Sequence, residues 1–229
     1  MITIHAIKKS YNQKVALNID HLTIKDGESV GIVGNNGAGK TTLFRSILDL
    51  IQLDEGFISI EGKDVKQSDH WKFSLNAFID ESFLISFLKP MEYLEFVGKT
   101  LGLEKSQIKL SLERFSDLVN DDISKNKKLI RNLSTGSKIR VGLLAAFLGD
   151  PKIILLDEPF AHLDPSSQAR LRKVLKNLNE EGKTIVLSSH NLQNVMEVSG
   201  RVILIENGEI RSDRQVSEQT LNELSAYFE

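Results

Sequence analysis

Short stretches of apolar residues open the chain. Ile2–Ile4, Ala16–Ile19 and His21–Ile24 have the pattern of strands, and a turn is predicted at Lys25-Asp-Gly-Glu28. Ser29–Val33 is a compact apolar strand that runs directly into glycines. The start of the chain is therefore predicted to be an antiparallel β strip followed by a buried strand.

Helical spacing follows this buried strand, with apolar residues at positions 43, 44, 47, 48 and 51. Residues 82–149 are mostly of helical pattern, with Pro90 at a helix start. Ile153–Leu156 and Thr184–Leu187 have the pattern of buried strands, and Gln168–Leu178 between them is helical. Strands that alternate with helices imply crossover connections. The sequence therefore predicts an α/β fold with a mostly parallel sheet, into which the helical middle is inserted.

The composition argues against several classes of protein. With 29 Lys and Arg against 31 Asp and Glu, the net charge is −2, so no basic excess points to nucleic acid or anionic lipid. The absence of cysteine excludes a disulfide scaffold and any cysteine-ligated metal site. No apolar run approaches the roughly 18 residues that cross a bilayer. We therefore expect a soluble chain that reaches a membrane only if another subunit holds it there.

A phosphate-binding loop is predicted between the strand Ser29–Val33 and the helix that follows it. The pattern G-x-x-x-x-G-K-T with one further threonine covers Gly34, Asn35, Asn36, Gly37, Ala38, Gly39, Lys40, Thr41 and Thr42. Glycines let the backbone N–H groups surround the phosphates, and the start of the helix adds positive potential. Lys40 would bridge the β- and γ-phosphates, and the Thr41 hydroxyl would ligate Mg²⁺. A glycine-rich turn with a surface lysine is the alternative, which the order of strand, loop and helix disfavours.

Two acids end the second buried strand, in the sequence Ile153-Ile-Leu-Leu-Asp157-Glu158-Pro159. Ligands of open parallel sheets collect beyond the carboxyl ends of the strands, so these acids should face the phosphate loop. We expect Asp157 to hold Mg²⁺ through water and Glu158 to orient or deprotonate the attacking water. A solvated pair of acids at a strand end is the alternative.

Together these motifs resemble the ATP-binding subunits of ABC transporters, and the resemblance covers nearly the whole chain. Leu133-Ser134-Thr135-Gly136-Ser137 stands where that family carries its signature, usually L-S-G-G-Q, before a helix. Ala161-His162-Leu163-Asp164 resembles the family's D-loop, directly after Asp-Glu-Pro. His190 matches the family's switch histidine, and Tyr11 stands where the family uses an aromatic ring against adenine.

The resemblance implies a dimer in which the signature helix of one copy points at the γ-phosphate held by the other. Ser134 would cap that helix and contact the anion, and Gly136 would permit close approach of the backbone. Asp164 is expected at the dimer interface together with Ser134. His190 would donate to the γ-phosphate and Tyr11 would stack on adenine. A packed histidine and a strand-edge aromatic are the alternatives for these two residues.

Several positions depart from the family's pattern. Thr135 and Ser137 replace a glycine and a glutamine of the signature, so we expect the ATP sandwich to form but to be weaker. Asn35 stands where a proline is common, which reduces rigidity. The Q-loop glutamine of the family corresponds to Asp80, whose carboxylate could ligate Mg²⁺ more strongly than an amide does. A register shifted by one would make Glu81 the relevant acid.

The sequence thus predicts an ATP-hydrolysing subunit of a transporter, with ATP and Mg²⁺ as cofactors. The chain is predicted to consist of a nucleotide-binding core, at about 1–80 and 150–229, and an inserted α-helical subdomain at about 81–149. A second copy of the chain and integral membrane permease subunits are the expected partners, with no nucleic acid. The resemblance places the chain on the cytoplasmic face of the membrane and favours a small exporter.

Three other functions stay open. A regulatory ABC-type ATPase with weak or no turnover is suggested by Thr135, Ser137 and Asp80. A non-transport ATPase of translation or DNA repair would usually carry two such domains or a long coiled coil, and neither pattern appears. An unrelated P-loop kinase would make the signature and D-loop matches coincidental.

An apolar run marks a possible docking groove between the core and the helical subdomain. It consists of Phe83, Leu84, Ile85, Phe87 and Leu88. The family receives a coupling helix of its permease in this region, so we expect the run to dock an amphipathic helix. Burial in the core is the equally weighted alternative.

Overall fold

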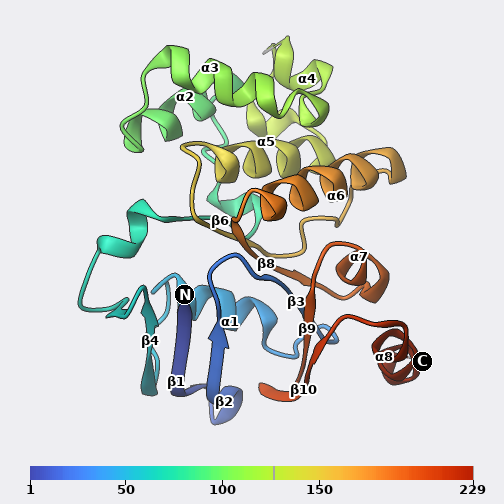
Figure 1. Cartoon of the computed structure of the whole chain (residues 1–229). Coiled ribbons are helices and arrows are strands. Elements are labelled where there is room, and N and C mark those ends of the chain that lie inside the picture. Colours follow the sequence, from blue (N-terminus) through green and yellow to red (C-terminus); the bar gives the residue numbers. More distant parts are fainter. Residues whose placement is uncertain (126, 229) are drawn as a thin grey trace.

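Two β-sheets stand side by side in the computed structural model, which describes residues 1–125 and 127–228 (Figure 1). The smaller sheet is antiparallel, with the order β2-β1-β4-β5 and the strands β1 (Ile2–Tyr11), β2 (Lys14–Ile24), β4 (Glu55–Ile60) and β5 (Lys63–Asp64). The two strands predicted at 16–19 and 21–24 are a single strand, because β2 stays paired with β1 through His21, which lies opposite His5. The predicted antiparallel strip is thus confirmed, with longer strands.

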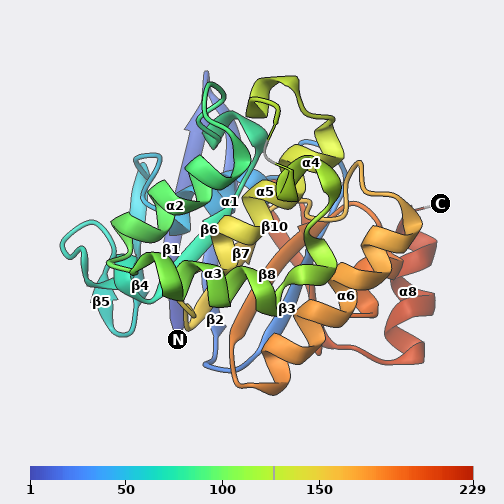
Figure 2. The same cartoon turned by 90° about the horizontal axis from the view of Figure 1, so that it is seen from above.

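The larger sheet has the order β10-β9-β3-β8-β7-β6, and only β10 runs antiparallel to its neighbour. Its strands are β3 (Ser29–Val33), β6 (Leu75–Phe78), β7 (Ile153–Leu156), β8 (Thr184–Ser189), β9 (Arg201–Glu206) and β10 (Glu209–Gln215). The mostly parallel sheet of the predicted fold class is therefore present. In Figures 1 and 2 the antiparallel sheet lies on one side of it and the C-terminal helix on the other.

Eight α-helices complete the described chain: α1 (Lys40–Ile47), α2 (Pro90–Thr100), α3 (Lys105–Arg114), α4 (Asp121–Ser124), α5 (Thr135–Phe147), α6 (Pro165–Glu180), α7 (Leu192–Met196) and α8 (Glu218–Phe228). Short 3-10 turns occur at His70–Phe73, Glu81–Phe83, Ser116–Leu118 and Ile130–Asn132. All elements between β6 and β7 are helical, as predicted for the middle of the chain. Pro90 is the first residue of α2, where its missing N–H costs no hydrogen bond.

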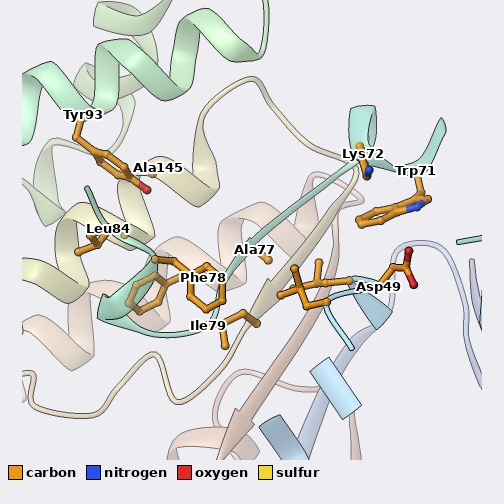
Figure 3. Close-up of a pocket in the computed structure, with 13 residues that line it drawn as sticks. Asp49, Trp71, Lys72, Ala77, Phe78, Ile79, Leu84, Tyr93 and Ala145 are labelled. Atoms are coloured by element: carbon orange, nitrogen blue, oxygen red, sulfur yellow. The ribbon is translucent and has the colours of Figure 1, made fainter. Parts of the chain in front are cut away.

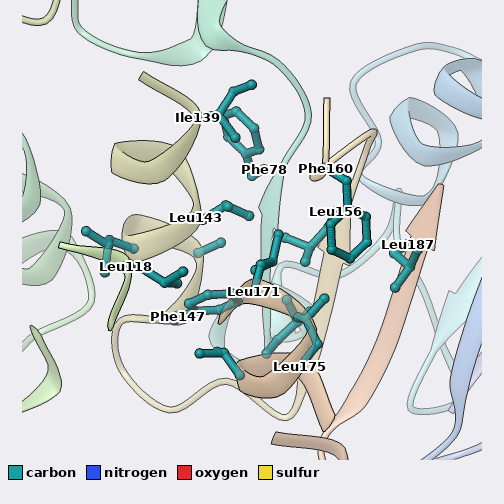
Figure 4. Close-up of a cluster of buried hydrophobic side chains, with 14 of the residues drawn as sticks. Phe78, Leu118, Ile139, Leu143, Phe147, Leu156, Phe160, Leu171, Leu175 and Leu187 are labelled. Carbon is teal, nitrogen blue, oxygen red and sulfur yellow. The ribbon is translucent and has the colours of Figure 1, made fainter. Parts of the chain in front are cut away.

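Successive residues of the parallel strands enter two different cores, which explains why β7 is apolar throughout. In β7, Ile154 and Leu156 face a core shared with α5 and α6, whereas Ile153 and Leu155 face a core shared with α1 and the antiparallel sheet. Figure 4 shows the first of these cores. Burial on both faces is typical of a parallel sheet covered by helices on each side.

Helix α5 packs directly on the sheet, although the predicted helical subdomain includes it. A Cβ atom added at Gly142 would lie 2.1 Å from the Phe78 ring, so only glycine allows this approach of α5 to β6. Helices α2, α3 and α4 lie beyond α5, away from β1 and β2 (Figure 1). The division at residues 80 and 150 stays a prediction.

Three strands of the larger sheet were absent from the elements predicted from sequence. Strand β6 has only four residues, too few for a clear period, and β10 is a polar edge strand with no apolar face. Strand β9 does carry an apolar run, Val202–Ile205, which is a usable signal. The missing strands leave the fold class unchanged but determine what lies beside the site.

Candidate functional site

The glycine loop leads from the end of β3 to the start of α1 and closes around the Lys40 side chain. Lys40 Nζ donates hydrogen bonds to the carbonyl oxygens of Gly34 at 2.6 Å and Asn35 at 3.3 Å, and the residue is 6% exposed. Gly39 has a φ of +112°, and a Cβ atom there would lie 2.6 Å from the Ala16 carbonyl oxygen. The loop therefore requires glycine both for its backbone angle and for its packing against β2.

The tip of the loop is open to solvent. Asn35, Asn36 and Gly37 are exposed, and a Cβ atom on Gly37 would meet no atom within 4 Å. Ala38 is buried below them, and Thr42 follows Thr41 in the first turn of α1. The first N–H groups of a helix have no partner within it, so this tip presents free donors to an anion.

Thr41 and Asp157 form a hydrogen bond across the sheet edge. Thr41 Oγ1 donates to Asp157 Oδ2 at 2.6 Å, and Ser188 Oγ donates to the other carboxylate oxygen. Asp157 is 5% exposed, and burial raises the pKa of its carboxyl, while the hydrogen bonds from Ser188 and Thr41 oppose part of that rise. A bound cation would offset this cost of burying a carboxylate.

These oxygen donors fit Mg²⁺, which prefers carboxylate and hydroxyl oxygens and keeps several other ligands. Among the described residues, no group of three or more His, Cys, Asp or Glu side chains could hold a metal ion. Thr41 Oγ1 and Asp157 Oδ2 would supply two of the ligands. Phosphate oxygens and water would complete the coordination shell, as is usual for Mg²⁺ bound together with a nucleotide.

Glu158 lies between Lys40 and His190. Its Oε1 is 3.6 Å from Lys40 Nζ, and its Oε2 is 2.9 Å from His190 Nδ1. The Glu158 backbone has a φ of +47°, unusual for a residue with a side chain, and its N–H donates to Ser188 Oγ at 2.9 Å. Such backbone strain concentrates at functional sites, and here it turns the carboxylate toward the phosphate loop. The structure thus brings Lys40, Thr41, Asp157, Glu158 and His190 together.

Sequence reasoning missed Ser188 at this site. The predicted strand ended at Leu187, whereas β8 continues through Ser188 to Ser189 and places the hydroxyl between the two acids. The available signal was its position directly after an apolar strand, at the same sheet edge as Asp157.

The signature residues form a second cluster around the start of α5. Ser134 is the N-cap, and its Oγ accepts a hydrogen bond from the Ser137 N–H at 3.2 Å. A Cβ atom on Gly136 would lie 2.8 Å from the His162 carbonyl oxygen, so the helix start touches the 161–164 loop. Within the described chain, Ser134 and Gly136 contact these neighbours and not the phosphate loop of the same copy. Thr135 is exposed beside them.

Ser137, one of the departures from the signature, is buried in a polar network. Its Oγ donates to Asp122 Oδ2 at 3.2 Å and accepts from Asn120 Nδ2 at 3.0 Å. A hydrogen bond from Lys128 holds the pKa of the Asp122 carboxyl below its usual value, assisted by Ser137. Sequence reasoning missed this network, although Asn120 before two acids is an N-cap signal for α4.

Asp164 caps α6 and joins it to α5. It accepts hydrogen bonds from the Ser167 N–H at 3.0 Å and Ser166 Oγ at 2.7 Å, and it pairs with Arg140 of α5 at 2.9 Å. Hydrogen bonds, that from Ser167 foremost, hold the pKa of the Asp164 carboxyl far below its usual range. Its expected place at a dimer interface stays a prediction.

Tyr11 is the last residue of β1 and is 47% exposed, with Lys9 Nζ 5.2 Å from the centre of its ring. The hairpin that carries it leads into β2, whose Ala16 touches Gly39 of the loop. The exposed ring thus has the Lys9 ammonium near one face, and its stacking on adenine stays a prediction.

Asp80 follows β6, which pairs with β7, so it lies two residues beyond the same sheet edge as Asp157. Its Oδ1 accepts from the Ser82 N–H at 2.7 Å, and its Oδ2 is 3.4 Å from Arg45 on α1. Glu81 instead pairs with Lys138 on α5 at 3.2 Å. Of the two acids, Asp80 is the one that contacts the helix of the phosphate loop.

A groove of about 360 Å³ lies next to these acids, between α2 and the core (Figure 3). Trp71, Phe78, Ile79 and Tyr93 line it together with Phe83. The predicted apolar run is divided: Phe83 and Phe87 are 51% and 68% exposed, Leu84 is buried, and Ile85 and Leu88 are half-buried. Core burial therefore accounts for Leu84 but not for the two phenylalanines.

Comparisons with known proteins give the following similarities. The family model described as ABC transporter matches residues 17–161, and one described as an AAA domain of the AbiEii toxin, Type IV TA system, matches residues 128–197. The ABC transporter ATP-binding protein NatA of Bacillus subtilis is 37% identical over 191 residues, covering 82% of this chain and 77% of NatA. The lantibiotic transport ATP-binding protein SrtF of Streptococcus pyogenes is 31% identical over 215 residues, covering 94% of this chain and 91% of SrtF.

Among solved structures, a dimeric ATP-binding cassette in a post-hydrolysis state bound to ADP and Pi superposes with a TM-score of 0.84. It is 25% identical and covers 95% of this chain and 99% of that one. The chain spans only 59% and 60% of the length of two other relatives, ABC transporter ATP-binding proteins of Synechocystis and Nostoc. No helix in the described part of the chain has both the length and the apolar character needed to cross a membrane.

Proposed function

The chain belongs to the ABC transporter family of ATP-binding proteins, and we propose that it binds ATP with Mg²⁺ and hydrolyses it. The observation that carries the proposal is the cluster at the sheet edge, where Glu158 contacts both Lys40 and His190 and Asp157 contacts Thr41. These contacts join three segments of the chain, and each member of the cluster has a chemical task in phosphoryl transfer.

The substrate phosphates would lie on the loop tip, where the Lys40 ammonium and backbone N–H groups of the loop would face the β- and γ-phosphates. The Ala38 N–H is not among these groups, because it donates to the Asn35 carbonyl oxygen at 3.1 Å. Thr41 and Asp157 would hold Mg²⁺, which when bound would offset the phosphate charge and fix the position of the γ-phosphate. Tyr11 would stack on the adenine ring without reading its hydrogen-bonding edge, which favours weak base selectivity.

Glu158 would act as the general base. Its carboxylate would accept a proton from the attacking water while His190, 2.9 Å from Oε2, keeps the carboxylate in one orientation. His190 is 58% exposed at its side chain and so has room to contact the γ-phosphate as well. Lys40 Nζ lies 3.6 Å from the other carboxylate oxygen, Oε1.

Two copies would sandwich two nucleotides, with Ser134 and Gly136 of one copy against the γ-phosphate held by the other. Two observations support this: the signature helix start is exposed, and the similar cassette bound to ADP and Pi is dimeric. Asp164 would lie at the interface, because it caps α6 beside the loop that touches Gly136.

The dimer would drive transport through separate integral membrane permease subunits at the cytoplasmic face of the membrane. The groove at Phe83 would receive an amphipathic helix of the permease, because Phe83 lines it with 51% of its surface exposed, beside the partly buried Tyr93. Export is the proposed direction; the relative SrtF is named a lantibiotic transport ATP-binding protein, and that name gives no direction.

The test is the oligomeric state of full-length Glu158→Gln protein with Mg²⁺ and ATP, measured by analytical ultracentrifugation. Loss of the base should trap the ATP-bound dimer, while Mg²⁺ with ADP leaves monomers. Lys40→Ala in the same background is the matched control and should stay monomeric with either nucleotide. Glu158→Gln protein that stays monomeric in saturating MgATP overturns the proposal.

A regulatory ATPase with little turnover is the second candidate, because Ser137 is tied into a buried network with Asp122 and Thr135 adds bulk at the signature. Steady-state phosphate release separates the two functions. Turnover in the wild type that Glu158→Gln abolishes supports hydrolysis, whereas nucleotide-dependent dimers without phosphate release support regulation.

We further propose that Asp80 makes nucleotide binding depend steeply on Mg²⁺, since its carboxylate lies beyond the same sheet edge as Asp157 and would repel a triphosphate without the metal. Titration of ATP affinity against Mg²⁺ for wild type and Asp80→Gln tests this. A shallower dependence in the variant is expected, and identical curves rule the idea out.

A further inference from the structure

A buried hydroxyl group lies between the two acids that follow β7. Ser188 is 0% exposed, and Ile185–Leu187 before it in β8 are apolar. Its Oγ accepts a hydrogen bond from the Glu158 N–H at 2.9 Å and donates one to Asp157 Oδ1. A hydroxyl is costly to bury unless it is hydrogen-bonded, and both of its partners here belong to the proposed site. Ser188 therefore joins the side chain of one acid to the backbone of the other.

The pairing of the strands explains why Ser188 reaches both acids. Strands β7 and β8 are parallel, and the ladder between them ends where Leu156 pairs with Leu187 (both labelled in Figure 4). One residue further along each strand, Ser188 lies beside Asp157. The Asp157 N–H still donates to a backbone carbonyl oxygen of β6 at 2.9 Å, whereas the Glu158 N–H donates to the Ser188 side chain. The hydroxyl thus takes the place of a strand partner where the chain leaves the sheet.

The Glu158 backbone is held in a conformation that needs such support. Its φ of +47° lies in the left-handed region, which residues with a side chain seldom adopt. That conformation directs the carboxylate to His190 Nδ1 at 2.9 Å and Lys40 Nζ at 3.6 Å. A strained backbone persists only where the surrounding structure fixes it. Any change of φ at Glu158 turns its N–H relative to its side chain, and the hydrogen bond to Ser188 opposes this turn.

A hydroxyl suits this position because it can donate and accept at once. It has one hydrogen for the Asp157 carboxylate and lone pairs for the Glu158 N–H. Ser188→Ala would leave that N–H without this partner. The Asp157 carboxylate would lose one hydrogen bond but keep the other, from Thr41 Oγ1 at 2.6 Å. The substitution should therefore disturb the backbone of Glu158 more than the carboxylate of Asp157.

We propose that Ser188 is a positioning residue for ATP hydrolysis, whose hydroxyl fixes the Glu158 peptide and so aims the base at the attacking water. The inference deepens the proposed function and rests on it. Ser188 is fully buried, so it does not reach the nucleotide itself and acts through Glu158. Its removal should therefore slow turnover and leave nucleotide binding nearly unchanged.

The first test compares steady-state phosphate release by full-length wild type, Ser188→Ala and Ser188→Cys. Misplacing a reacting group costs rate steeply, so Ser188→Ala should lower kcat about 10- to 100-fold and change KM by less than about twofold. Ser188→Cys keeps a weaker donor and acceptor and should have an intermediate kcat. The matched control is Ser29→Ala, which removes another buried hydroxyl, bonded to the Val198 carbonyl oxygen at 3.0 Å, and should keep the wild-type kcat.

The second test is a double-mutant cycle with Glu158→Gln, measured in single-turnover reactions. Ser188→Ala should not lower the residual rate of Glu158→Gln protein further, because the base that it positions is already absent. Both Glu158→Gln protein and the double variant should still dimerise with MgATP. An equal loss of rate in the two backgrounds would mean that Ser188 acts on Asp157 or on the fold, and would overturn the proposal.

Hydrogen exchange of the Glu158 amide, measured by NMR without nucleotide, tests the contact itself. Exchange should be about tenfold faster in Ser188→Ala than in wild type, because the amide loses its hydrogen-bond acceptor, and it should be unchanged in Ser29→Ala. Equal exchange in Ser188→Ala and wild type would overturn the proposal whatever the rates of hydrolysis.

The outcomes separate the positioning role from the proposed function. If wild-type protein releases no phosphate, the proposed hydrolysis fails, and the role of Ser188 fails with it. If wild type hydrolyses ATP while Ser188→Ala matches Ser29→Ala, the proposed function stands and the positioning role is wrong. Should Ser188→Ala not fold, Ser188→Cys decides: a kcat below that of Ser29→Ala supports the role, and an equal kcat overturns it.

Discussion

Thr41 Oγ1 donates a 2.6 Å hydrogen bond to Asp157 Oδ2, although 116 positions separate the two residues. Thr41 follows the loop after β3 and Asp157 follows β7, and β8 lies between these strands. The bond therefore exists only because parallel strands bring their carboxyl ends to one edge. It places a hydroxyl and a buried carboxylate where both can face one cation.

Thr41→Val should weaken MgATP binding by about tenfold, because the isosteric side chain removes one metal ligand and one hydrogen bond to a charged group. Fluorescence titration of nucleotide with Mg²⁺ and with EDTA measures this. The difference from wild type should vanish in EDTA, and Thr100→Val on the exposed end of α2 is the control. An equal loss in EDTA would show that Thr41 acts on the fold rather than on the metal.

His190→Ala should lower kcat by about 10²- to 10⁴-fold with only a small change in KM, because the variant loses the contact that orients the Glu158 carboxylate. Steady-state phosphate release gives both constants. His70→Ala removes another exposed histidine, next to Glu61, and should leave both unchanged. A raised KM at unchanged kcat would assign His190 to nucleotide binding alone.

Gly136→Ala should destabilise the protein by about 1–2 kcal/mol and weaken dimerisation. The new methyl group would lie 2.8 Å from the backbone oxygen of His162, and this clash outweighs the gain in helix propensity of at most about 1 kcal/mol. Urea unfolding measures the first effect. Gly200→Ala is the control, since its methyl group would lie 3.9 Å from the closest backbone oxygen, an ordinary contact. Equal stability of the two variants would contradict the close approach.

Acidification should remove the contribution of Asp122 to stability. Its folded-state pKa is lowered, so the ionised carboxylate stabilises the fold above pH 3.8, and this contribution is lost as the pH falls below that value through the folded pKa. Asp122→Asn should be less stable than wild type near pH 6, and the two should converge in denaturant titrations as the pH falls further below 3.8. A difference that persists at the lowest pH would be due to packing and not to charge.

Phe83→Asp should abolish co-purification with the permease while leaving the melting temperature unchanged, because Phe83 is 51% exposed and contributes little to the core. Pull-down from native membranes measures the association. Leu110→Asp, a 65% exposed apolar position on α3, should retain it. A folded Phe83→Asp variant that still assembles with the permease would show that the groove is not the docking site.

Local chemistry in the sequence determined the elements that carry the phosphate loop and the acids. The glycine spacing around Lys40 predicts the phosphate-binding turn that leads from β3 into α1. Pro90 and Ser134 predict helix starts, because the preference for proline at the first helical position and for serine at the N-cap depends on the first turn alone. The continuous apolar run before Asp157 predicted a strand buried on both faces. These features follow from the sequence because each depends on neighbouring residues alone.

Only the tertiary structure decided which distant side chains meet. The pairs of Arg45 with Asp80 and of Lys138 with Glu81, and the contact of Ser137 with Asp122, join charged or polar residues that could each have pointed to water. Strand β10 likewise has no apolar pattern and forms because β9 offers an edge to pair with. Sequence periodicity predicts which face of a helix or strand is apolar. Which polar side chains contact each other depends on how the helices and strands pack in space, and no local sequence pattern determines that packing.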